Sequence, residues 1–306
     1  PNAALFSMAD LTIGGTGSLT VTGNTGDGIA SKDGLVISGG TITVTAVDDG
    51  IRGKDYLIVT GGTVTVDAED DGLKSDNETD DTVGYVLVQG GTVTVAAGDD
   101  GIHAEGDLAV EGGTLTVTRS TEGLEGSTIT IAGGETRVTA SDDGLNATQG
   151  STASSTQGGQ GGGGMQDDGS LLTISGGTLT VDAGGDGLDS NGTIVVTGGT
   201  TTVNGPTMNG NGALDSNGGI TVTGGTLAAG GSSGMAESPG SASTTGWVAV
   251  ALPSAVPAGK TVTVVKDGTV VATFTTTKET ASLVVAAEGI TSGESYEIQV
   301  DGTTAT

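Results

Sequence analysis

Residues 48–68 read DDGIRGKDYLIVTGGTVTVDA, and this stretch contains the pattern that decides the fold. After the acidic-glycine pair, apolar residues recur with a spacing of two, first at Leu57 and Val59 and then at Val64 and Val66. Alternation of β-branched and other apolar residues is typical of strands and not of helices. A third apolar position directly after the acidic-glycine pair, together with the Gly-Gly turn, predicts a three-sided coil of short strands.

The same pattern repeats along most of the chain. Asp27, Asp49 and Asp71 each begin a copy of the acidic-Gly-Ile/Leu motif and stand 22 residues apart. Further copies of this motif begin at Asp100, Glu122, Asp143 and Asp186. The interleaved Gly-Gly-Thr-x-Thr-Val motif begins at Gly39, Gly61, Gly90, Gly112, Gly176 and Gly198. Repeats of this length indicate one supersecondary unit per period, stacked on its neighbours.

We therefore predict an all-β fold, a right-handed parallel β-helix of about nine coils followed by a small antiparallel β module. The right-handed form is preferred because left-handed β-helices usually repeat by hexapeptides. Insertions are expected near residues 76–84 and 148–169, and the β-helix is expected to span residues 1–230. Residues 231–245 read as a linker, and residues 246–306 as the antiparallel module that caps the open end of the solenoid.

Composition excludes several classes of protein. The chain of 306 residues has 60 Gly, no Cys, and only one Trp, three Tyr and two Phe. A net charge of −28 argues against nucleic acid as a partner, because phosphate binding needs basic patches. The absence of Cys excludes disulfides and thiolate metal sites. No stretch reaches the ~20 apolar residues of a membrane span.

Carboxylates occupy one position in successive coils, and neighbours about 4.8 Å apart repel by ~3–4 kcal/mol at an effective dielectric of 20. Calcium, which takes 6–8 oxygen ligands, would relieve this repulsion. Alternatively, each Asp accepts a backbone N–H of its own turn, and the two roles are compatible. The predicted metal ligands are Asp48, Asp49, Asp70, Asp71, Asp76, Asp99, Asp100, Glu122, Asp142, Asp143, Asn146, Asp186 and Asp189. The sequence thus predicts calcium along this edge.

A row of basic residues lies beside the acidic turns. Arg52, Lys74 and His103 hold one position in consecutive coils, with Lys54 nearby, and Glu125 follows them at the same position. These residues either balance the charge of the acidic row or bind sugar carboxylates. Tyr56 and Tyr85 share an outward position and either form a platform for sugars or an exposed aromatic ladder.

Other chemistry is weakly supported. Outward threonines such as Thr63 and Thr65 recur on one strand of each coil, where threonine is simply a good solvent-facing strand residue. Similar flat arrays occur in ice-binding β-helices, but Glu135 and Arg137 interrupt this one. No catalytic residue is assigned, and the lone His103 excludes a histidine triad that needs a second histidine.

The runs DDGIRGKDYL, DDGLKSDN and DDGIHA, with the Gly-Gly-Thr-x-Thr-Val repeats, resemble a bacterial secreted carbohydrate-binding parallel β-helix family. The resemblance covers roughly residues 1–230. Members of that family bind cellulose or acidic plant polysaccharides such as polygalacturonate. The resemblance implies calcium on the acidic turns and a fold akin to β-helical polysaccharide lyases. The last coil departs from the pattern, with Gly212-Ala213-Leu214 in place of the acidic turn.

The expected function is calcium-dependent binding of a polysaccharide, outside the cell or at its surface, with any signal peptide or anchor beyond this sequence. The ligand residues would be Arg52, Lys54, Lys74, His103, Tyr56 and Tyr85. The first alternative is a calcium-dependent polysaccharide lyase, with the basic residues as base and charge partner. The second is a structural cell-surface adhesin or filament subunit. The scarcity of aromatic residues favours a charged glycan over a crystalline one.

Overall fold

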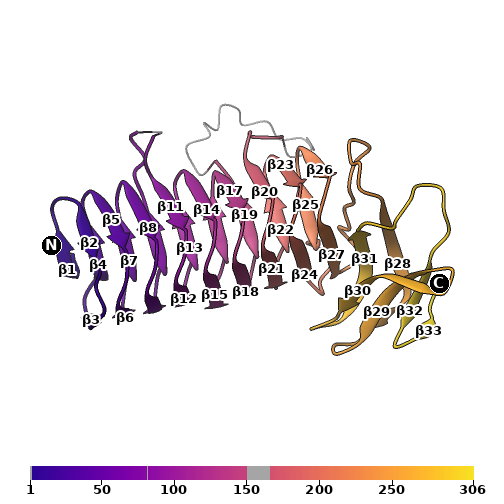
Figure 1. Cartoon of the computed structure of the whole chain (residues 1–306), viewed down its shortest axis with the longest axis horizontal. Helices are drawn as coiled ribbons and strands as arrows, with labels where there is room; N and C mark the ends of the chain where they lie inside the picture. The colour runs from indigo at the N-terminus through magenta and orange to yellow at the C-terminus, as the bar shows by residue number, and fades with distance from the viewer. Residues whose placement is uncertain (1, 81, 150–165) are drawn as a thin grey trace.

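The computed structural model describes residues 2–80, 82–149 and 166–306 and has an all-β fold. A parallel β-solenoid of about nine turns is followed by a small antiparallel sheet at the C-terminal end, as the sequence predicts (Figure 1). Most of the second predicted insertion, residues 150–165, lies outside the described residues. None of the described residues forms a helix that could cross a membrane.

Three parallel sheets, here called A, B and C, form the walls of the solenoid. Sheet A contains β1 (Ala3–Ser7), β4 (Asp27–Ser31), β7 (Ile51–Gly53), β10 (Leu73–Ser75), β13 (Ile102–Ala104), β16 (Leu124–Gly126), β19 (Leu145–Ala147), β22 (Leu188–Ser190) and β25 (Leu214–Ser216). Sheet B contains β2 (Leu11–Ile13), β5 (Gly34–Ile37), β8 (Tyr56–Val59), β11 (Tyr85–Val88), β14 (Asp107–Val110), β17 (Thr128–Ile131), β20 (Leu171–Ile174), β23 (Thr193–Val196) and β26 (Gly219–Val222). The parallel part of sheet C contains β3 (Ser18–Gly23), β6 (Thr41–Ala46), β9 (Thr63–Ala68), β12 (Thr92–Ala96), β15 (Thr114–Arg119), β18 (Glu135–Ala140), β21 (Thr178–Ala183), β24 (Thr200–Asn204) and β27 (Thr226–Gly231).

The register places equivalent residues of successive repeats directly beside one another. Leu57 pairs with Leu35 on one side and with Val86 on the other. Val64 pairs with Ile42 and is fully buried in the same continuous core. Burial of these apolar columns is the main stabilising contribution, because each coil covers the open face of its neighbour.

The glycine of the acidic-Gly-Ile/Leu motif is required by close packing. A Cβ atom added to Gly72 would lie 2.2 Å from Cγ1 of Val95 and 2.6 Å from the carbonyl oxygen of Gly101 in the next coil. Both distances are shorter than real Cβ contacts, so the side chain of sheet C fills the space that a larger residue would need. The recurrence of this glycine is therefore a steric requirement of the coil.

The C-terminal module continues sheet C. Strand β31 (Thr280–Ala286) pairs antiparallel with β27 of the last coil and also with β28 (Trp247–Val256). Strands β29 (Thr261–Lys266), β30 (Thr269–Thr275), β32 (Glu297–Val300) and β33 (Thr303–Thr304) form a separate four-stranded antiparallel sheet. Pairing with β31 covers the edge of β27, which would otherwise expose unpaired backbone groups.

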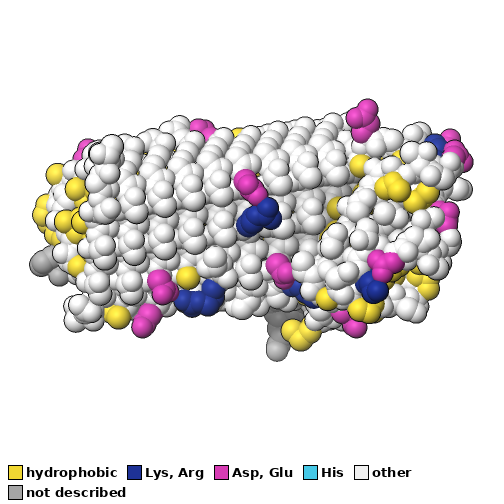
Figure 2. Space-filling model, turned by 60° about the horizontal axis from the view of Figure 1, so that its bottom comes forward, with side chains coloured by type: hydrophobic (Ala, Val, Ile, Leu, Met, Phe, Trp, Pro, Cys, Tyr) yellow, Lys and Arg dark blue, Asp and Glu magenta, His cyan; other side chains and the backbone are white. Residues whose placement is uncertain are grey.

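The outer face of sheet C is broad and mostly free of charged side chains (Figure 2). Threonine rows run across it, as in the paired Thr63 and Thr92. Glu135 and Arg137 of β18 replace two threonines and form an ion pair. The expected interruption of the threonine array is therefore present.

Candidate functional site

Buried carboxylates line the turn that leads into sheet A. Asp27, Asp49, Asp71 and Asp100 are between 1% and 6% exposed, although each carries an ionisable group. Each of these carboxylates is buried because it directly precedes the buried glycine of its coil. Burial raises the pKa of Asp49 to about 7, although Lys74 opposes the shift. Such groups need a partner, because burying an unpaired charge is costly.

In the N-terminal half, basic residues of sheet A supply that partner. Lys74 Nζ lies 2.6 Å from Asp71 Oδ2 in its own coil and 3.3 Å from Asp49 Oδ1 in the preceding coil. Arg52 Nη1 likewise lies 3.5 Å from Oδ2 of Asp27 in the preceding coil. The register pairs Lys74 with Arg52, so the predicted basic row exists. Its members bridge carboxylates of adjacent coils and so balance the charge of the acidic row.

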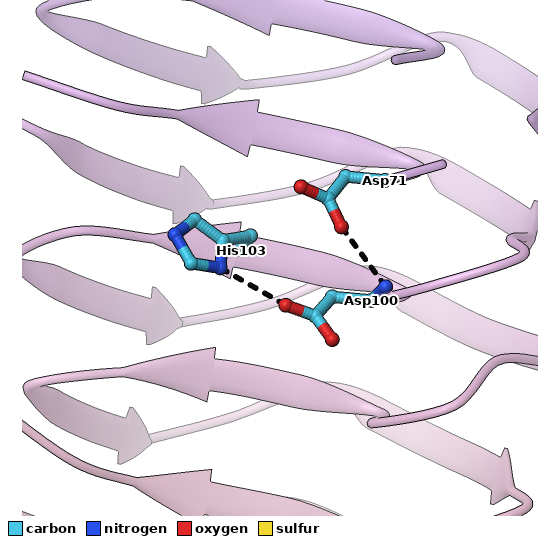
Figure 3. Close-up of side chains that lie close together, drawn as sticks. All are labelled: Asp71, Asp100 and His103. Carbon is cyan, nitrogen blue, oxygen red and sulfur yellow. Dashed lines mark hydrogen bonds and ion pairs between the residues drawn. The ribbon is translucent and has the colours of Figure 1, made fainter. Parts of the chain in front are cut away.

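His103 is the last member of the basic row, because Glu125 takes the same position in the next coil. Its Nδ1 atom lies 2.9 Å from Asp100 Oδ2, while the backbone N–H of Asp100 donates a 2.9 Å hydrogen bond to Asp71 Oδ1 (Figure 3). Burial would lower the pKa of His103, but its hydrogen bond to Asp100 and the nearby carboxylates raise it above the ordinary value. The histidine therefore acts as a further partial cation in the ladder.

Beyond His103 the same position carries no cation. The register continues from His103 to Glu125, then to Asn146, Asp189 and Asp215. Among the described residues, Lys and Arg make no ion pair with these acids or with the turn acids Glu122, Asp143 and Asp186. The one contact of these acids with a basic group in the described chain is that of His103 Nδ1, which lies 3.8 Å from Glu125 Oε1. We call residues Glu122, Glu125, Asp143, Asn146, Asp186, Asp189 and Asp215 the uncompensated ladder.

Two carboxyl groups of the uncompensated ladder, those of Glu125 and Asp189, bind protons more tightly than usual. Burial, together with a hydrogen bond to Glu122, raises the pKa of Glu125 to about 10. Burial and the neighbouring charges of Asp143, Asp186 and Asp215 raise the pKa of Asp189 to about 8. Without a cation these groups must hold protons near neutral pH, so the ladder has a strong affinity for a positive charge.

Several groups of acidic residues could hold a metal ion. Within the described chain, four sets have ligand atoms within 4.8 Å of one another: Asp27 with Asp48 and Asp49, Asp49 with Asp70 and Asp71, Asp71 with Asp100 and His103, and Asp100 with Glu122 and Glu125. The last set adjoins Asn146, whose Nδ2 donates a 2.8 Å hydrogen bond to Glu122 while its Oδ1 is buried without a partner. An oxygen-rich set with an unpaired amide oxygen suits a hard cation such as Ca²⁺.

Several of the predicted metal ligands, among them Asp76, Asp99 and Asp142, lie outside the four sets. Asp76 forms an ion pair of 3.3 Å with Arg52 Nε and belongs to none of the four sets. Asp99 and Asp142 are exposed beside the turns. The hydrogen bonds to the turn carboxylates cross between coils: Asp143 accepts from the backbone N–H of Asp186 at 2.6 Å, not from its own turn.

The two predicted tyrosines lie side by side on sheet B. Their ring centroids are 5.5 Å apart and the planes differ by 18°. The Tyr56 hydroxyl donates a 3.2 Å hydrogen bond to Asp10. The predicted shared position is confirmed by the pairing of Tyr85 with Tyr56. These rings form a small aromatic platform beside the turn that carries Lys54.

Two basic residues near this platform have no acidic partner within the described residues. Lys54 and Lys32 are absent from every ion pair there, and they follow the paired residues Gly53 and Ser31 in adjacent coils. Lys32 is exposed and Lys54 is half-buried. In contrast to Arg52 and Lys74, these two ammonium groups are available to an external anion.

Comparison with known proteins assigns the family. Residues 1–169 match the family of carbohydrate-binding domain-containing proteins. The chain belongs to this family. A carbohydrate-binding domain-containing protein of Acetivibrio thermocellus is 50% identical over 46 residues, which cover 15% of this chain and 16% of that relative. No solved structure matches the chain.

Sequence reasoning missed two features of this region. Lys32 shares its position with Lys54, which counting from the acidic turns would have shown. The hollow between the 76–84 loop and Tyr85 depends on the path of the loop, which no periodic pattern encodes.

Proposed function

We propose that this protein is an extracellular, calcium-dependent polysaccharide-binding module for acidic glycans such as polygalacturonate. The proposal rests on the uncompensated ladder, in which no Lys or Arg follows His103 at its position in the later coils. In the same ladder the Oδ1 atom of Asn146 is buried without a hydrogen-bond partner. Family membership supports the carbohydrate part of the proposal.

Calcium fits the donors at this place. Asp100, Glu122, Glu125 and Asn146 would hold it through carboxylate and amide oxygens. Because Ca²⁺ takes 6–8 oxygen ligands, positions are left for water or for a glycan carboxylate. A bound ion would also remove the need for Glu125 to hold a proton.

Lys32 and Lys54 would bind further glycan carboxylates. Both are free of ion pairs among the described residues, whereas Arg52 and Lys74 are held by the buried Asp row. A polyanion lying along this edge would meet the two ammonium groups in adjacent coils. This charge pattern supports an acidic glycan.

One candidate base of the lyase alternative, Lys74, is held as a cation by two carboxylates. Burial would lower the pKa of Lys74, but the charges and hydrogen bonds of Asp71 and Asp49 raise it above the ordinary value. A general base must be unprotonated at the working pH. Lys74 is therefore a poor proton acceptor, and a lyase would have to use Lys54 as its base.

Native electrophoresis through a gel cast with polygalacturonate tests the proposal. We expect retardation with Ca²⁺ and free mobility with chelator. Lys54→Ala should weaken the retardation, and the exposed Glu111→Gln should leave it unchanged. Unchanged mobility of the wild type with Ca²⁺ would overturn acidic-glycan binding, and a cleared zone around the band would show a lyase.

A further inference from the structure

Tyr85 of the aromatic platform stacks on another aromatic ring on one face only. Tyr56 leans over Gly34, where an added Cβ would lie only 1.9 Å from the ring, and Tyr85 stacks on Tyr56. Because Val86 pairs with Leu108, the residues before them, Tyr85 and Asp107, are also neighbours in adjacent coils. Asp107 therefore stands where a third aromatic ring would continue the stack. The outer face of Tyr85 is therefore not covered by another aromatic ring.

A hollow of about 290 Å³ lies against Tyr85. Its lining includes Asn77 and Glu78, which follow β10, and Glu105, Asp107 and Ser127 of the next two coils. The Nδ2 atom of Asn77 donates a 2.6 Å hydrogen bond to Asp55 Oδ1, which holds Asn77 against the preceding coil. The volume is at the lower end of the ~300–1,000 Å³ typical of small-molecule sites, so it suits a single ring.

The charge of the hollow selects its ligand. Three carboxylates, those of Glu78, Glu105 and Asp107, line it, and none of its described lining residues is Lys, Arg or His. These acids form none of the sets in the described chain that converge on one point within 4.8 Å. The hollow therefore suits a ligand larger than an ion, with hydroxyl or ammonium donors and no negative charge.

We propose that this hollow binds one pyranose ring without a negative charge, stacked on the face of Tyr85 that is turned away from Tyr56. Hydroxyl groups would donate to Glu105 and Asp107, and an amino sugar would bind most tightly because its ammonium meets carboxylates and an aromatic face. The inference rests on the carbohydrate-binding function but needs no calcium and no contact with the uncompensated ladder.

Calorimetric titration of the full chain in chelator tests this site. The probes are β-1,4-linked hexamers of glucosamine, of glucose and of galacturonic acid. We expect affinity to fall in that order. Tyr85→Leu keeps an apolar strand residue but removes the flat face, and it should weaken binding about 3- to 10-fold. Tyr85→Phe should bind like the wild type.

A second pair of variants tests the charge. Glu105→Gln with Asp107→Asn should reduce the preference for glucosamine over glucose several-fold, whereas a merely structural role would leave the preference unchanged. The exposed Glu111→Gln serves as the control. Equal binding by the wild type and Tyr85→Leu, or galacturonate binding as tight as glucosamine binding, would overturn the proposal. Because the titration is done in chelator, failure of calcium-dependent binding would not affect it.

Discussion

The backbone N–H of Asp100 donates a 2.9 Å hydrogen bond to the Oδ1 atom of Asp71, which belongs to the preceding coil. Asp143 and Asp186 repeat this arrangement in the C-terminal half. The acidic row thus joins successive coils as well as concentrating negative charge. Its carboxylates have a structural role whether or not they also bind a metal ion.

Removal of Lys74 should destabilise the solenoid. Lys74→Met leaves Asp49 and Asp71 without their shared cation, and breaking a buried pair costs on the order of 3 kcal/mol in free energy of unfolding. Urea denaturation in chelator would measure the loss. Lys260→Met, which removes an exposed pair with Asp301, should cost much less than Lys74→Met. Equal losses for the two variants would contradict this account.

The stability of the metal-free protein should fall as the pH rises from 5 to 8. Burial raises the pKa of Asp143 to about 7 and that of Asp189 to about 8 in the folded state. The unfolded chain releases these protons near the ordinary pKa of 3.9. The folded state therefore binds more protons within this window, and its advantage is lost as pH rises through the folded values. Thermal melts in chelator should show a lower Tm at pH 8 than at pH 5, and the opposite slope would contradict it.

Calcium should stabilise the protein through Glu125 and its neighbours. At 100 times the Kd, binding to the folded state alone adds ~2.7 kcal/mol. Glu125→Gln removes a charged ligand of the proposed site and should reduce the calcium-induced rise in Tm at pH 8. Glu111→Gln, an exposed acid elsewhere, should retain the full rise. Differential scanning calorimetry with Ca²⁺ and with chelator would decide, and an undiminished rise in Glu125→Gln would place the ion elsewhere.

Gly72→Ala should disturb the coil. The new Cβ would overlap Val95 and the carbonyl of Gly101, and overpacking of this kind costs ~1–3 kcal/mol. Gly17→Ala is a matched control, because a Cβ there meets nothing within 4 Å. Its free energy of unfolding should change by about 0.5 kcal/mol or less. Chemical denaturation of both variants would test whether the glycine is required by packing.

Counting residues was sufficient to predict the stacking. The 22-residue spacing of Asp27, Asp49 and Asp71 predicts equivalent positions, and the register pairs Leu35 with Leu57 accordingly. Across the insertion near residues 76–84, counting back from Leu57 and Val86 predicts the observed pairing of Tyr56 with Tyr85. Period-two alternation fixes which side chains point inward, because a slip by one residue would turn the apolar face outward. The same counting placed Arg52, Lys74 and His103 in one row.

Contacts between coils were decided only by the tertiary structure. The sequence by itself determined the repeat, the three strands per coil, the position of the acidic row and the carbohydrate-binding resemblance. Only the fold showed that Lys74 is held by Asp49 and Asp71, that Asn146 Oδ1 is left without a partner, and that Asn77 brings a loop beside Tyr85. The physical reason is that periodicity specifies direction and register, whereas pairing and burial depend on side-chain distances set by neighbouring coils and by irregular loops.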